Sequence, residues 1–113
     1  MAALAVVGAL AAGACSAGQA TSNVATLDAP ALQACRDLRA VIQARAAGTL
    51  RPADLRTRLG QVYDEAASSV NPIIKARAVA VFADATEIAS GGEGSSLTSD
   101  LAAMLQTCSG ASQ

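Results

Sequence analysis

Two groups of acidic residues are the first candidates to examine for acid–base catalysis or metal binding. Asp64 and Glu65 are adjacent and diverge by about 100° on a helix, whereas Asp84 and Glu87 are three residues apart and share a face. Carboxylates in these patterns are more typical of a solvated helix surface. The chain contains no histidine, which removes the commonest general base and the commonest metal ligand. We therefore expect no metal site and no catalytic role for these residues.

The sequence also lacks the residue patterns that nucleophilic catalysis usually requires. The sequence has no Gly-x-Ser-x-Gly motif, and without histidine its serines have no common base to activate them. The glycine-rich stretch 91–96 precedes a predicted helix, where phosphate can bind, but it lacks the lysine and the preceding strand of a P-loop. We expect this stretch to be a flexible loop, and we expect a protein with no enzymatic activity and no cofactor.

A group of arginines is the best candidate for a binding surface, because it surrounds the predicted turn between the first two helices. These residues are Arg45, Arg51, Arg56 and Arg58. As one surface, they would bind an envelope protein or an anionic cell-wall polymer. The simpler interpretation is that they are ordinary surface arginines, paired with acidic residues such as Asp54, Glu87 or Asp100. The formal net charge of −1 argues against a nucleic-acid partner.

The N-terminal residues 2–14 form an uncharged apolar run, shorter than the roughly 20 residues of a spanning helix and typical of a secretory signal peptide. Small residues then precede Cys15. This segment resembles the lipobox of bacterial prolipoproteins. The resemblance implies cleavage before Cys15, a lipid on its sulfur, and anchoring to the outer face of the cell membrane. Residues 12–14 (AGA) also fit ordinary signal peptidase, so secretion without a lipid remains an alternative.

The state of Cys15 decides what the other two cysteines can do. If Cys15 carries a lipid, Cys35 and Cys108 remain as an even pair that can form a disulfide in the oxidising exterior. If it does not, the exported protein has an odd thiol. In the chain-entropy model, closing so long a loop would stabilise the domain by roughly 4 kcal/mol.

The spacing of apolar residues and the helix-breaking residues between them predict four helices. We expect the helices to begin near Pro30, Pro52, Pro72 and either Leu97 or Ser99. The apolar period of the second helix continues to Val70, and Gly48, Gly91 and Gly110 are the predicted stops of the first, third and fourth helices. The predicted inward faces are Leu32, Cys35, Leu38, Ile42 and Ala46 in the first helix; Leu55, Leu59, Val62, Ala66 and Val70 in the second; Ile74, Ala78, Val81, Ala85 and Ile88 in the third; and Leu97, Leu101, Met104, Leu105 and Cys108 in the fourth. Gly60 would allow a close helix crossing.

Short connections favour antiparallel neighbours. We therefore expect an all-α fold, a small up-down-up-down four-helix bundle closed by one disulfide. Residues 28–110 would form this domain, after a signal peptide (1–14) and a flexible tether (15–27), with a short tail at 111–113.

These observations favour a non-catalytic lipoprotein of the cell envelope that acts as a binding or interaction module. The alternative is an extracytoplasmic carrier of a small apolar ligand or haem, with Tyr63 at the mouth of a cavity between helices. The composition is against a large cavity, because the chain is rich in alanine and has only one other aromatic residue, Phe82.

Overall fold

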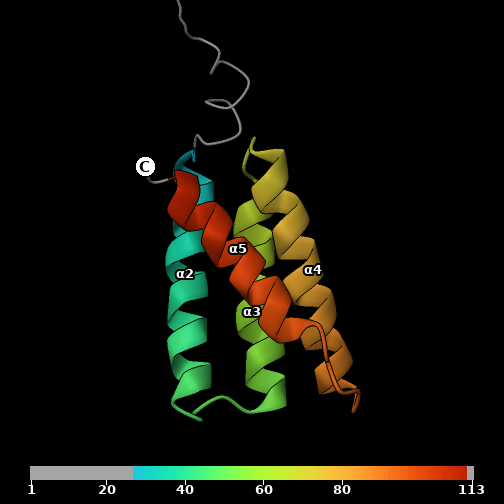
Figure 1. Cartoon of the computed structure of the whole chain (residues 1–113). Helices are drawn as coiled ribbons and strands as arrows, with labels where there is room; N and C mark the ends of the chain where they lie inside the picture. The colour runs from blue at the N-terminus through green and yellow to red at the C-terminus, as the bar shows by residue number, and fades with distance from the viewer. Residues whose placement is uncertain (1–26, 112–113) are drawn as a thin grey trace, which may run out of the picture.

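The computed structural model describes residues 27–111, which form four α-helices and no strand (Figure 1). The helices are α2 (Ala29–Ala46), α3 (Pro52–Ala67), α4 (Pro72–Ala89) and α5 (Leu97–Ala111). The predicted all-α class and the four helices are confirmed for this part of the chain. Two predicted boundaries are wrong, because α3 ends before Val70 and α5 continues through Gly110.

Local sequence accounts for the starts of α2 and α4. The Asp28 carboxylate caps α2 by accepting a hydrogen bond from the backbone N–H of Ala31 at 3.4 Å. Asn71 Oδ1 caps α4 by accepting from the N–H groups of Ile73 and Ile74 at 2.9 and 3.1 Å. Such caps satisfy N–H groups that the first turn of a helix leaves unpaired. Proline in the first turn favours the same starts.

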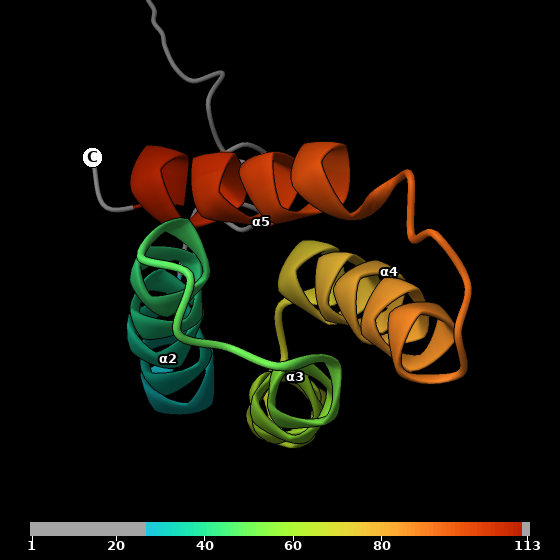
Figure 2. The same ribbon diagram turned by 90° about the horizontal axis from the view of Figure 1, so that it is seen from below.

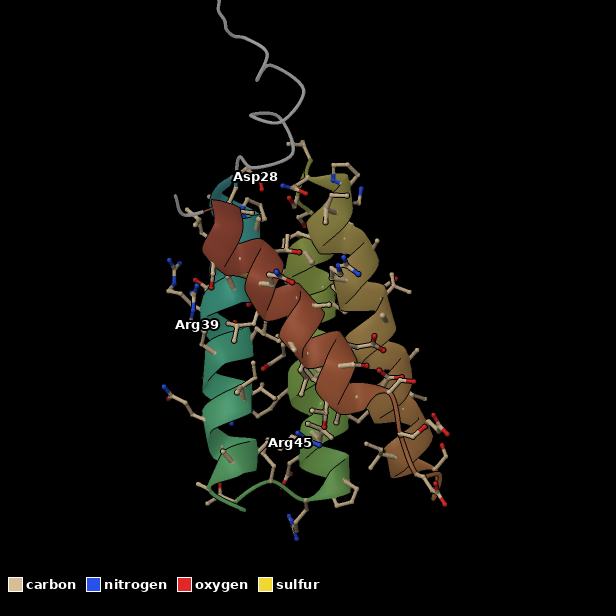
Figure 3. All side chains as sticks on the ribbon, in the orientation of Figure 1. Asp28, Arg39 and Arg45 are labelled. Carbon is tan, nitrogen blue, oxygen red and sulfur yellow. A yellow bond between two sulfur atoms is a disulfide. The ribbon has the colours of Figure 1, made fainter. Side chains whose placement is uncertain are left out.

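Asp28 also joins the start of α2 to the turn between α3 and α4. Ser69 Oγ donates to Asp28 Oδ1 at 2.7 Å, and the backbone N–H of Val70 donates to Oδ2 at 2.9 Å. The bond from Ser69 is the largest of the effects that hold the pKa of Asp28 below its ordinary value. Asp28 therefore connects two segments about 40 residues apart at one end of the domain (Figure 3).

The core is formed by the inward faces of all four helices. Its largest fully buried side chains include Leu38, Leu59, Ile74, Leu97 and Met104. Each buried side chain of this size contributes roughly 1.5–3 kcal/mol relative to an exposed one. Because these residues come from every helix, the four helices stabilise one another around one core.

The predicted inward face of α2 is partly wrong. Leu32 is 42 % exposed and Ala46 is exposed, whereas Ala31, Ala34 and Val41 are buried. The buried face is thus rotated toward small residues, which let a neighbouring helix approach closely.

The predicted inward face of α3 also has one error, at its C-terminal end. Val70 is 84 % exposed, because α3 has already ended and Val70 lies in the turn before α4. Ile42, Ile88 and Leu105 were predicted to face inward and are half-buried at the edge of the core.

Helix α5 lies obliquely across α2 and α4, and α3 is on the opposite side of the domain (Figures 1 and 2). The predicted disulfide is present and joins Cys35 of α2 to Cys108 of α5, with a Cα–Cα distance of 5.8 Å. Arg45, at the other end of α2, donates to Thr98 Oγ1 at 3.3 Å. Helices α2 and α5 are therefore held together at two places, one near each end of α5.

A glycine allows α3 and α4 to pack closely, as the sequence predicts. A Cβ atom at Gly60 would lie 3.2 Å from Cε1 of Phe82 on α4. The Phe82 ring stacks on Tyr63, with 5.3 Å between ring centroids, and the Arg56 guanidinium lies 5.8 Å from the Phe82 centroid. These aromatic rings therefore belong to the α3–α4 contact.

The glycine-rich loop before α5 packs partly against the domain. Gly94 is buried and has a positive φ of 59°, and a Cβ at this position would overlap the side chain of Ile88. Glycine is therefore required here both for backbone conformation and for space. The loop was predicted to be flexible, but at Gly94 it is in contact with α4.

Candidate functional site

A surface groove of about 350 Å³ lies between α2 and α5. Its lining residues are Arg39, Ile42, Gln43, Leu105 and Ser109. They follow from helical spacing, since Arg39 and Gln43 are one turn apart on α2, and Leu105 and Ser109 are one turn apart on α5. Ile42 and Leu105 are half-buried against the core, so they form an apolar floor beneath exposed polar groups.

The disulfide is next to this groove in both helices. Cys35 lies one turn before Arg39, and Cys108 directly precedes Ser109. The crosslink fixes the distance between α2 and α5 at this point, so the two walls of the groove are held by a covalent bond.

Arg39 supplies a positive charge at the edge of the groove, midway along α2 (Figure 3). Within residues 27–111, no carboxylate lies within ion-pair distance of its guanidinium. The nearby Arg36 donates to Gln33 at 2.6 Å. The groove therefore combines an apolar floor with a cation that has no counter-ion in the described part of the chain.

A pair of carboxyl groups lies between α2 and α3. Glu65 Oε1 is buried and has no hydrogen-bond donor among the described residues. Burial first, and then the hydrogen bond and negative charge of Asp37, raise the pKa of Glu65 to about 7. Gln33 Nε2 also donates to Asp37 Oδ1, at 3.2 Å. A protonated Glu65 can therefore donate to the Asp37 carboxyl group.

A second carboxyl pair lies between α4 and α5. Asp84 Oδ2 is buried without a hydrogen-bond donor in the described segment. Burial, then the hydrogen bond and charge of Asp100, and then the charge of Glu87 raise the pKa of Asp84 to about 6. The prediction that the acidic residues form only a solvated surface is therefore wrong for Glu65 and Asp84, although Asp64 and Glu87 are exposed.

The carboxyl pairs do not amount to a metal site. No group of three or more His, Cys, Asp or Glu residues that could hold a metal ion occurs among the described residues. Below the raised pKa values of Glu65 and Asp84, each pair can share a proton between two helices, so its main effect is on how stability depends on pH.

The four arginines of the predicted binding surface have separate neighbours. Arg51 forms an exposed ion pair with Asp54 at 3.2 Å, Arg45 bonds to Thr98, and Arg56 lies over the ring of Phe82. Arg58 is half-buried, whereas the other three are exposed. The expected pairing with Asp54 is present for Arg51, and an exposed pair of this kind is worth little, about 0–1 kcal/mol.

Tyr63, the predicted candidate for a cavity mouth, lies elsewhere. Its ring is half-buried and stacked on Phe82 at the contact between α3 and α4. It is not among the residues that line the groove between α2 and α5. The groove therefore offers a ligand Arg39, Gln43 and Ser109 as polar contacts, and not the tyrosine.

The fold and the site together define a small, disulfide-closed, all-α domain with a groove between two crosslinked helices. Comparisons of the chain with protein-family models, with curated proteins and with solved structures find no match. None of the helices in residues 27–111 has the length and apolar character needed to cross a membrane. Cys15, the predicted lipidation site, lies outside the described residues.

Proposed function

We propose that this protein is a non-enzymatic binding module of the cell envelope, exported and anchored through a lipid on Cys15. The observation that carries this proposal is the Cys35–Cys108 disulfide. Disulfides persist mainly in oxidising compartments outside the cytoplasm. With two of the three cysteines joined, Cys15 is the remaining cysteine, and the residues before it resemble a lipobox.

The anchor predicts a specific mass for the protein extracted from membranes. We expect a chain that begins at Cys15, carries added acyl groups, and is lighter by two hydrogen atoms because of the disulfide. Intact-mass spectrometry of the detergent-extracted protein measures all three together. The Cys15→Ser variant is the matched control, and it should lose the acyl mass and leave the membrane fraction. An unprocessed chain with three reduced thiols would contradict both export and anchoring.

The scaffold we propose for this module is an up-down-up-down four-helix bundle. Two contacts support it. Asp28 places the start of α2 beside the α3–α4 turn, and Arg45 places the end of α2 beside the start of α5. Short connections between helices agree with this arrangement.

Arg45, Arg51, Arg56 and Arg58 remain the proposed surface for an anionic partner. Three of them are exposed, and Asp54 forms the one ion pair found in residues 27–111. A polymer of linked phosphates would gain affinity from several such charges at once, and salt would weaken the binding.

Binding of polyglycerol phosphate tests this arginine surface. The double variant Arg51→Gln/Arg56→Gln should bind several-fold more weakly than the parent chain and show a smaller dependence on salt. The control Arg36→Gln/Arg77→Gln removes the same charge elsewhere, on α2 and α4. Equal losses in the two double variants would mean that net charge alone attracts the polymer, and would contradict a defined arginine surface.

A carrier of a small apolar ligand is the second candidate function. The groove between α2 and α5 favours it, because the groove has an apolar floor and a volume at the lower end of the range for ligand pockets, roughly 300–1,000 Å³. A haem carrier has less support, since Tyr63 does not line this groove.

A further inference from the structure

The groove between α2 and α5 has the features of a site for one particular class of ligand. Its floor is apolar, its edge carries one guanidinium, and two further polar groups, Gln43 and Ser109, stand on opposite helices. A purely apolar ligand would gain nothing from the exposed polar groups of the edge. A bare anion would leave the floor formed by Ile42 and Leu105 in contact with water.

The charge at the groove selects the sign of the ligand. Arg39 has no carboxylate within ion-pair distance among residues 27–111. The acidic residues on α2 and at its start are engaged elsewhere: Asp37 pairs with Glu65, and Asp28 caps α2 and bonds to the next turn. An anionic group at the groove would therefore meet a positive charge without a competing carboxylate. The planar guanidinium also matches a carboxylate, which it can bind through two hydrogen bonds.

The volume of the groove limits the length of the apolar chain that a ligand could place in it. A volume of about 350 Å³ holds roughly a dozen groups of the size of a water molecule, at ~30 Å³ each. That is the size of a single, medium-length acyl chain. Because the groove is open to solvent, an acyl chain in it would be only partly enclosed, and two long chains would exceed its volume.

We propose that the groove between α2 and α5 binds a medium-chain fatty acid, with its carboxylate on Arg39 and its acyl chain against Ile42 and Leu105. Gln43 and Ser109 add hydrogen bonds to the carboxylate from the two walls. This inference rests on the proposed binding function, in its form as a carrier of an apolar ligand. It gives that ligand a chemical class.

The test uses decanoate as the probe and the full, oxidised chain with Cys15→Ser, so that no attached lipid competes. Titration below the micelle-forming concentration, followed by calorimetry and by NMR of the backbone amides, should show one site with shifts on α2 and α5. Arg39→Gln should weaken decanoate binding by up to about fivefold, because an ion pair at an exposed arginine is lost. The control Arg77→Gln, an exposed arginine on α4, should bind as the parent does.

Two further ligands and one further variant separate the parts of the site. Decanol should bind more weakly than decanoate to the parent, and equally to the parent and Arg39→Gln. Inorganic phosphate should bind far more weakly than decanoate. Leu105→Asn should weaken both decanoate and decanol, with its fold checked by circular dichroism. Phosphate binding as tight as decanoate, equal effects of Arg39→Gln and Arg77→Gln, or shifts confined to α3 and α4 would overturn the proposal.

The test of the fatty-acid site and the test of the lipid anchor can fail independently of each other. A lipidated chain in membranes that does not bind decanoate would leave the anchored module standing and remove the fatty-acid site. An unlipidated chain that binds decanoate at Arg39 would do the reverse.

Discussion

Replacing the disulfide with two alanines, Cys35→Ala/Cys108→Ala, should lower the free energy of unfolding by about 4 kcal/mol. The bond joins residues 73 positions apart, and in the chain-entropy model a loop of this length restricts the unfolded chain by that amount. Small domains are stable by only about 5–15 kcal/mol in total, so this is a large share. Urea denaturation followed by circular dichroism measures the change as a lower midpoint.

The control for this experiment is Cys15→Ala, which replaces the one cysteine outside the disulfide and outside the described residues. It should leave the urea midpoint of the oxidised chain unchanged. Treatment of the parent chain with a reductant should reproduce the midpoint of the double variant. Equal midpoints for the parent and the double variant would contradict a stabilising role for the crosslink.

The melting temperature should rise as the pH falls from about 8 toward about 5. The pKa of Glu65 is raised to about 7 and that of Asp84 to about 6, chiefly by burial and then by Asp37 and Asp100. A raised pKa means that the folded state binds the proton more tightly than the unfolded state. This stabilisation is therefore complete below the ordinary pKa of a carboxyl group, and it is lost as the pH rises through about 6 and 7.

Asp28 makes the stability of the fold depend on pH in the opposite direction, and it does so at lower pH. Its pKa is lowered, first by the Ser69 hydroxyl, so its contribution is present above its ordinary pKa of 3.8 and is lost as the pH falls. Together with the raised pKa values of Glu65 and Asp84, this places the greatest stability between about pH 4 and pH 6.

Neutral variants identify the groups responsible for the pH dependence. Glu65→Gln and Asp84→Asn should each raise the melting temperature at pH 8, because an amide at either position donates to the facing carboxylate without adding charge. Each should also flatten the dependence on pH. Glu93→Gln, in the exposed part of the loop before α5, is the control and should change neither. A parent chain that is most stable at pH 8 would contradict this account.

The helix starts could be predicted from sequence because their causes are local. Asp28 lies two residues before Pro30 and Asn71 directly precedes Pro72, and both are caps in the structure. The inward face of α2 was harder to predict, because Leu32 is more hydrophobic than its neighbour Ala31 and is nevertheless exposed. In an alanine-rich chain, the closeness of a neighbouring helix decides which residues are buried, and hydrophobicity alone does not.

The carboxyl pairs and the groove could not be predicted from the sequence, because both are formed by residues of two different helices. Glu65 and Asp84 each directly precede a buried alanine, a signal that they lie beside the core, but their partners Asp37 and Asp100 come from other helices. The groove was missed for a related reason. Composition argued against an enclosed cavity, whereas the space observed is an open groove where α5 meets α2.

The disulfide also determines how this domain would carry a mechanical load. If tension were applied between the two ends of the chain, it would reach Cys35 about two helical turns after Asp28 and then pass through the covalent bond to Cys108. The rest of α2, together with α3 and α4, lies within the closed loop and outside this path. Stretching would therefore unwind the first turns of α2 and the last residues of α5, and it would leave most of the core intact.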